Sequence, residues 1–110
     1  MAKKPRISIA ADHAGYPLKK ELVHYLQEAG YSVNDLGPRS GSKSVDYPDF
    51  AVKVVNDILG GKSERGALVC GTGIGMAMAA NRFAGIRAAA VYDMTTAEMA
   101  AKHNHANVLC

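Results

Sequence analysis

A chain of 110 residues, with 48% hydrophobic and 21% charged residues, has the size and composition of one globular domain. Its net charge of +3 comes mostly from scattered lysines and arginines, and it has no Trp and two Phe, so a nucleic-acid-binding surface is not expected. No apolar run approaches the roughly 20 residues of a membrane helix, and two cysteines without a C-x-x-C pair predict neither a disulfide framework nor structural zinc. We therefore expect a cytosolic protein, and the slight positive balance suits a small anionic ligand.

The first half of the chain predicts two strand–helix units. Residues 6–11 predict a buried strand, and a helix follows with Pro17 in its first turn and Gly30 just past its end. Residues 31–37 predict a second, shorter strand, which a polar loop at 38–45 follows. A second helix begins near residues 46–48 and ends at Gly60-Gly61.

The second half continues the alternation. Its predicted elements are a strand at 66–70, a glycine loop, a short helix at 75–84, a strand at 86–92, a helix at 95–104 and a strand from 107. The last helix is expected to open with a capping box between Thr95 and Glu98. Such alternation predicts one α/β domain over residues 1–110, with a Rossmann-like, doubly wound, parallel five-stranded sheet and helices on both faces.

Several side chains that carry chemistry follow the predicted strands. They are Asp12 and His13 after the first strand, Cys70 and the glycine loop after the third, Tyr92 and Asp93 after the fourth, and His103, Asn104 and His105 at the end of the last helix. Ligands of open α/β sheets bind at the carboxyl ends of the strands. We therefore expect acid, imidazole, thiol and glycine loop to converge there.

The glycine loop predicts an anion site. Gly71, Gly73 and Gly75 permit backbone conformations in which successive N–H groups turn toward one point, and the helix that follows adds partial positive charge. A dinucleotide is one alternative, with Asp93 as the ribose-binding acid, but Met76 stands where G-x-G-x-x-G needs its third glycine. A tight turn without any ligand is another alternative.

Cys70 precedes this loop. A thiol close to amides and a helix N-terminus ionises more readily than a free thiol, so it can act as a nucleophile or a general base. A small buried residue at the end of a strand is equally compatible with its position. His103 and His105 point to different faces of their helix, so a shared metal is not expected.

Four segments carry a resemblance to a known family: AADHAGYPLK (10–19), DYPDFA (46–51), CGTGIGMAMAANRFAGIRAA (70–89) and KHNHANVL (102–109). In these segments, which span nearly the whole chain, the sequence resembles the sugar-phosphate isomerases of the type B ribose-5-phosphate isomerase and galactose-6-phosphate isomerase family. The resemblance implies interconversion of ribose 5-phosphate and ribulose 5-phosphate through a cis-enediolate. It also implies that no metal or organic cofactor takes part.

The resemblance assigns roles residue by residue. Cys70 matches the base that abstracts the proton, and Thr72 lies near it to assist. The amides of Gly71, Thr72, Gly73, Ile74 and Gly75 would stabilise the enediolate, while Asp12, His13, Tyr47 and Asn104 would contact the substrate, His13 near its phosphate or ring oxygens. His103 matches the residue that opens the furanose ring. The family works as a homodimer or a dimer of dimers in which His103 and Asn104 reach the partner's site.

One departure from the family concerns phosphate binding. The family continues beyond the fifth strand with arginines that hold the substrate phosphate, whereas Arg82 and Arg87 fall on other parts of the motif. We expect weaker phosphate binding without those charges. An inactive truncated isomerase therefore stays open as an alternative, as does the nucleotide-binding module that the glycine loop and Asp93 suggest. The sequence does not choose among ribose, allose and galactose phosphates as the substrate.

Overall fold

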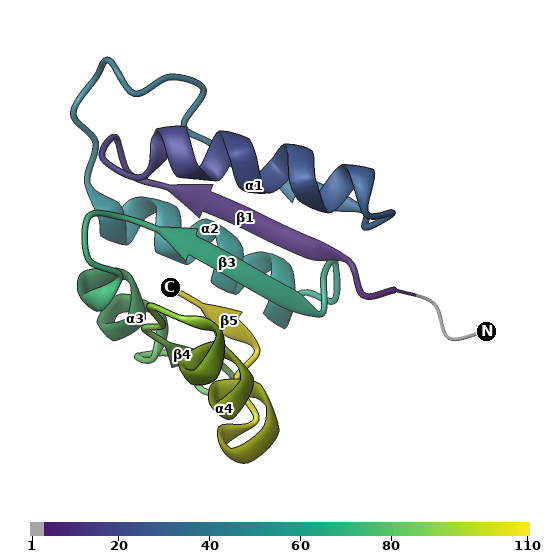
Figure 1. Ribbon diagram of the computed structural model, residues 1–110. Helices are drawn as coiled ribbons and strands as arrows, with labels where there is room; N and C mark the ends of the chain where they lie inside the picture. The colour runs from purple at the N-terminus through teal and green to yellow at the C-terminus, as the bar shows by residue number, and fades with distance from the viewer. Residues whose placement is uncertain (1–3) are drawn as a thin grey trace.

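Five parallel strands form one sheet in the computed structural model, which describes residues 4–110 (Figure 1). The strands are β1 (Ile7–Ala11), β2 (Val33–Asp35), β3 (Arg65–Val69), β4 (Ala88–Ala89) and β5 (Val108–Leu109), and the sheet order is β2-β1-β3-β5-β4. The connecting helices are α1 (Tyr16–Glu28), α2 (Tyr47–Leu59), α3 (Ile74–Ala80) and α4 (Met94–Asn104). The predicted α/β fold with a parallel five-stranded sheet is confirmed.

The helices cover both faces of this sheet. α2 and α3 pack together on one face, where Val54, Val55 and Met76 are fully buried against the strands. α1 and α4 lie on the other face, one on each side of a groove over β3 (Figure 1). Parallel strands covered in this way are rich in apolar residues, as the fully buried Ile9 and Ala10 of β1 illustrate.

The close approach of α2 fixes the position of β3, the central strand. A Cβ atom at Gly66 would lie 2.5 Å from Cγ1 of Val54, so only glycine lets the helix pack this closely. β3 pairs with β1 along its whole length, from Ile7 opposite Arg65 to Ala11 opposite Val69. The carboxyl ends of these two strands are therefore level, and the segments that follow them begin side by side.

Several predicted boundaries were wrong, including those of β2, which spans Val33–Asp35 rather than residues 31–37. α3 ends at Ala80 because the side chain of Asn81 turns back and exchanges two hydrogen bonds, of 2.7 and 2.8 Å, with the backbone of Ala88. β4 spans two residues because pairing with β5 is limited to Ala88 and Ala89. α4 begins at Met94, and its capping box joins Asp93 to Thr96 rather than Thr95 to Glu98.

No helix within the described part of the chain has both the length and the apolar character needed to cross a membrane.

Candidate functional site

Cys70 lies at the carboxyl end of β3, and the glycine loop wraps around its sulfur. The backbone N–H of Gly73 donates a hydrogen bond to Cys70 Sγ at 3.1 Å. Gly73 has a φ of +81°, in the left-handed region that favours glycine, and caps the N-terminus of α3. A donor at this distance stabilises negative charge on the sulfur, as a base requires.

The second thiol, Cys110, follows β5 and lies against the same loop. A Cβ atom at residue 73 would lie 2.9 Å from the carbonyl carbon of Cys110. Burial, and to a smaller extent the charge of Cys70, raises the pKa of Cys110 to about 12. Cys110 therefore stays neutral at physiological pH, and Cys70 is the better candidate for a base.

Some backbone amides of the loop have no protein partner among the described residues. The N–H of Ile74 donates to Thr72 Oγ1 at 3.2 Å, and that of Gly73 donates to Cys70. Within residues 4–110, the N–H groups of Gly71 and Thr72 donate to no protein atom. A Cβ at Gly71 would meet nothing within 4 Å, so its backbone is open to a ligand.

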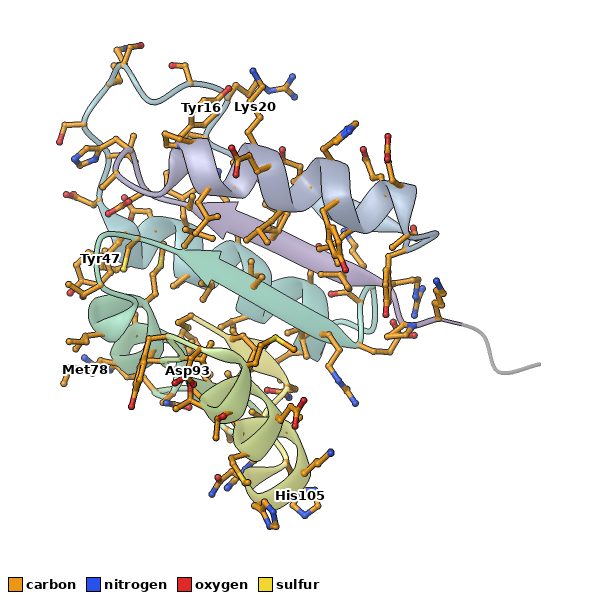
Figure 2. All side chains as sticks on the ribbon, viewed as in Figure 1. Tyr16, Lys20, Tyr47, Met78, Asp93 and His105 are labelled. Carbon is orange, nitrogen blue, oxygen red and sulfur yellow. The ribbon has the colours of Figure 1, made fainter. Side chains whose placement is uncertain are left out.

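Tyr47, the first residue of α2, closes one side of the loop. A Cβ atom at Gly75 would lie 2.8 Å from Cε1 of the Tyr47 ring, so the ring packs directly on the glycine. Figure 2 shows Tyr47 beside the start of α3. Gly75 therefore has a structural reason to be glycine, in addition to any contact that its amide makes.

Asp12 ties the end of β1 to the end of β3. Its N–H donates to the carbonyl of Val69 at 3.0 Å, and its Oδ1 accepts the N–H of Gly15 at 2.9 Å. A Cβ at Gly15 would lie 2.2 Å from the Val69 carbonyl oxygen, so the turn passes very close to β3. His13 lies in this turn, is exposed, and accepts the N–H of Val45 at Nδ1 at 3.2 Å.

The expectation that His103 and His105 converge with Cys70 within one chain was wrong. α4 begins after the carboxyl end of β4 and runs back along the sheet, and its 11 residues make it about 16 Å long. At its other end the carbonyl of Asn104 accepts a hydrogen bond of 2.6 Å from Nε of Arg87, the residue before β4. Figure 2 shows His105 at the end of the molecule far from Tyr47.

Asp93 is engaged in the structure of α4. Its Oδ1 accepts the backbone N–H of Thr96 at 2.7 Å, and this bond, followed by the one from the Thr96 hydroxyl, lowers the pKa of Asp93. This use of the carboxylate disfavours the interpretation of Asp93 as a ribose-binding acid, and its neighbour Tyr92 is almost fully exposed. Among residues 4–110, no group of three His, Cys, Asp or Glu side chains could hold a metal ion.

The structure therefore brings Asp12, His13, Tyr47 and the loop of residues 70–75 to one end of the sheet, without His103 and Asn104 of the same chain. Sequence reasoning missed three residues of the site. Gly15 lets the turn after β1 pass close to β3, the Val45 N–H hydrogen-bonds to His13, and Cys110 packs on Gly73. Gly15 lies two residues after the Asp12-His13 pair, and a glycine at this position was the one local signal. The contacts of Val45 and Cys110 join distant segments and leave no local pattern.

Known proteins resemble nearly the whole chain. A family model described as "Ribose/Galactose Isomerase" matches residues 7–110. A relative from Rickettsia bellii, named a putative sugar phosphate isomerase, is 50% identical over 103 residues, which are 94% of this chain and 71% of the relative. The solved ribose 5-phosphate isomerase of Thermotoga maritima has a TM-score of 0.94 and 48% identity, covering 97% of this chain and 73% of that one. The Mycoplasma genitalium ribose-5-phosphate isomerase B, solved with bound ribulose-5-phosphate, has a TM-score of 0.89 and 43% identity, covering 96% and 70%.

Proposed function

The chain belongs to the ribose/galactose isomerase family, and we propose that it is an aldose–ketose isomerase that interconverts ribose 5-phosphate and ribulose 5-phosphate. Two similar structures carry the name ribose 5-phosphate isomerase, and one of them holds ribulose-5-phosphate. The single observation in this chain that carries the proposal is the hydrogen bond of 3.1 Å from the Gly73 N–H to Cys70 Sγ. It supports a thiolate base beside a loop of free amides.

Cys70 is the base in this proposal. Its thiolate removes the proton on C2 of the open-chain aldose, the electron pair of that bond forms the C1–C2 double bond, and the C1 carbonyl oxygen becomes an enediolate oxygen. The proton then returns to C1, while the hydroxyl proton on O2 moves to O1 and leaves the ketone at C2. No redox partner is consumed, since one carbon is oxidised as its neighbour is reduced.

The loop amides stabilise the enediolate. The N–H groups of Gly71 and Thr72 are free to donate to the oxygen on which negative charge develops. Loss of one donor of this kind reduces turnover on the order of 10²–10³-fold in other enzymes. The loop of residues 70–75 contains no acidic side chain that could act as the base instead, which leaves Cys70 in this role.

We further propose that the site is completed by a second copy of the chain in a homodimer, or a dimer of dimers. His103 and Asn104 lie far from Cys70 of the same chain, so ring opening by His103 requires the partner's α4. Large apolar side chains surround the edge strand β4, with Met78 70%, Tyr92 85% and Met94 76% exposed. Exposed apolar patches of this kind mark protein interfaces.

The direct test is the conversion of ribose 5-phosphate to ribulose 5-phosphate, followed by the absorbance of the ketose product. Allose 6-phosphate and galactose 6-phosphate serve as competing substrates, and the preferred sugar is the one with the highest kcat/KM. Titration with NAD and NADP tests the nucleotide-binding alternative, for which we expect no binding. Folded chain without turnover on any sugar phosphate would support the inactive isomerase instead.

A further inference from the structure

A polar loop holds His13 from one side. The backbone N–H of Val45 donates to Nδ1 of the imidazole at 3.2 Å, across 32 positions of sequence. An imidazole nitrogen that accepts a hydrogen bond carries no proton, so neutral His13 must carry its proton on Nε2. A proton on Nδ1 would instead face the Val45 N–H, with two donors directed at each other.

The polar loop of residues 38–45 packs against the turn that contains His13. A Cβ atom at Gly41 would lie 3.3 Å from both the His13 carbonyl oxygen and Cβ of Tyr16, so the middle of the loop is packed on the His13 turn. The Tyr16 ring covers the ammonium of Lys19, at 5.2 Å from the ring centroid. Lys19 is buried and pairs with Asp35 at 2.7 Å. Figure 2 shows Tyr16 close to this loop.

The other end of the loop is fixed by α2. Val45 directly precedes Asp46, the N-cap residue of α2, and Tyr47 then packs on Gly75 of the glycine loop. The segment that contains Val45 is therefore held at both ends, by the His13 turn at Gly41 and by the start of α2. In the described part of the chain, Val45 is the one residue that hydrogen-bonds to the His13 ring, and Nε2 is left without a protein partner.

We propose that the backbone N–H of Val45 positions His13 for substrate binding by holding the imidazole as the Nε2–H tautomer. This inference rests on the proposed function, in which His13 contacts the phosphate or ring oxygens of the sugar phosphate. A phosphate oxygen needs a donor, which Nε2–H supplies, whereas the other tautomer would present a lone pair to the anion. The chain thereby gains a phosphate-directed donor that does not depend on protonation of the ring.

Val45→Pro removes the N–H, and Val45→Ala keeps it. Because the bond acts on substrate binding, we expect Val45→Pro to raise KM for ribose 5-phosphate roughly tenfold, the equivalent of one hydrogen bond, with kcat within about twofold. Val45→Ala should match the unsubstituted chain in both constants. An unchanged KM in folded Val45→Pro would overturn the proposal.

A spectroscopic measurement tests the tautomer without any activity. In the ¹⁵N-labelled chain, we expect a scalar coupling across the hydrogen bond between the Val45 amide nitrogen and Nδ1 of His13, with the proton of the ring on Nε2. His13→Gln assigns the signal by its loss. A proton on Nδ1, or no coupling at neutral or higher pH, would overturn the proposal even if Val45→Pro does not fold. If the coupling is present but no sugar phosphate is turned over, the proposed function fails. Calorimetry of ribose 5-phosphate binding to Val45→Pro and Val45→Ala then tests the role of the tautomer, and equal affinities would overturn it.

Discussion

Cys110 lies against Gly73 so closely that a Cβ atom at residue 73 would come within 2.9 Å of its carbonyl carbon. The end of β5 thereby supports the residue whose N–H points at the Cys70 sulfur. The supporting contact and the left-handed backbone of Gly73, with φ of +81°, both require glycine. The geometry around the Cys70 sulfur, the proposed base, thus depends on a strand that is adjacent to β3 but distant in sequence.

Gly73→Ala is expected to lower kcat on the order of 10²-fold, because the displaced N–H no longer stabilises the thiolate. It should also destabilise the fold by about 1–3 kcal/mol, the usual cost of a strained backbone conformation. Urea unfolding and steady-state turnover measure the two effects. Gly71→Ala is the control for stability, since a Cβ there meets no atom within 4 Å. Equal unfolding midpoints for the two variants would contradict this explanation.

Cys70→Ala is expected to abolish turnover while leaving the fold and the binding of ribose 5-phosphate largely intact, because a base acts in the chemical step. Cys110→Ala is the matched control, since the neutral Cys110 thiol has no part in the proton transfer and its contact with Gly73 is made mainly through its backbone. Turnover of ribose 5-phosphate and its binding by calorimetry are compared for both variants. Near-normal turnover in Cys70→Ala would remove the base role from this residue.

The stability of the fold should fall at low pH partly through Asp93. Its pKa is lowered in the folded state by the Thr96 hydrogen bonds, so its contribution is present above the ordinary pKa of 3.8 and is lost as pH falls through the folded value. Asp93→Asn keeps an N-cap acceptor but does not titrate, so its urea midpoint should decline less between pH 5 and pH 2. Asp46→Asn is the control, because Asp46 caps α2 without a side-chain hydrogen bond. If the urea midpoint of Asp93→Asn falls with pH as steeply as that of the unsubstituted chain, Asp93 does not contribute to the loss of stability at low pH.

The parallel sheet could be predicted because each strand is a short apolar run followed by a helix with its own end signals, such as Pro17 and Gly30. The position of Cys70 and the glycine loop followed from the strand-end rule. The capping of α4 was misassigned because the pairs Thr95-Glu98 and Asp93-Thr96 overlap in sequence, and it is the Asp93 carboxylate that accepts the backbone N–H of Thr96, at 2.7 Å. His103 was misplaced because the rule applies to residues after strands, whereas His103 ends a helix that returns to the amino ends of the strands.

The separation of His103 from Cys70 leads to a test by mixing two inactive variants. Cys70→Ala lacks the proposed base and His103→Ala lacks the proposed ring-opening residue, so each alone should show little turnover of the cyclic substrate. In a mixed dimer, one site combines the native Cys70 of the His103→Ala subunit with the native His103 of the Cys70→Ala subunit. Random re-association makes half of the dimers mixed, each with one intact site, so about one quarter of the activity of the unsubstituted chain should return.

The control is His24→Ala, an exposed histidine of α1 that pairs with Glu28. Alone, His24→Ala should have unchanged turnover. Its mixture with Cys70→Ala should have only the activity expected from diluting His24→Ala with an inactive chain, without additional recovery. Activity of the mixture of Cys70→Ala and His103→Ala is measured after partial unfolding and refolding together, against each variant refolded alone. If the mixture recovers no more than the sum of its parents while light scattering reports dimers, both residues act within one chain or His103 does not act at all. The observed placement of His103 beside the amino ends of the strands makes recovery the expected result.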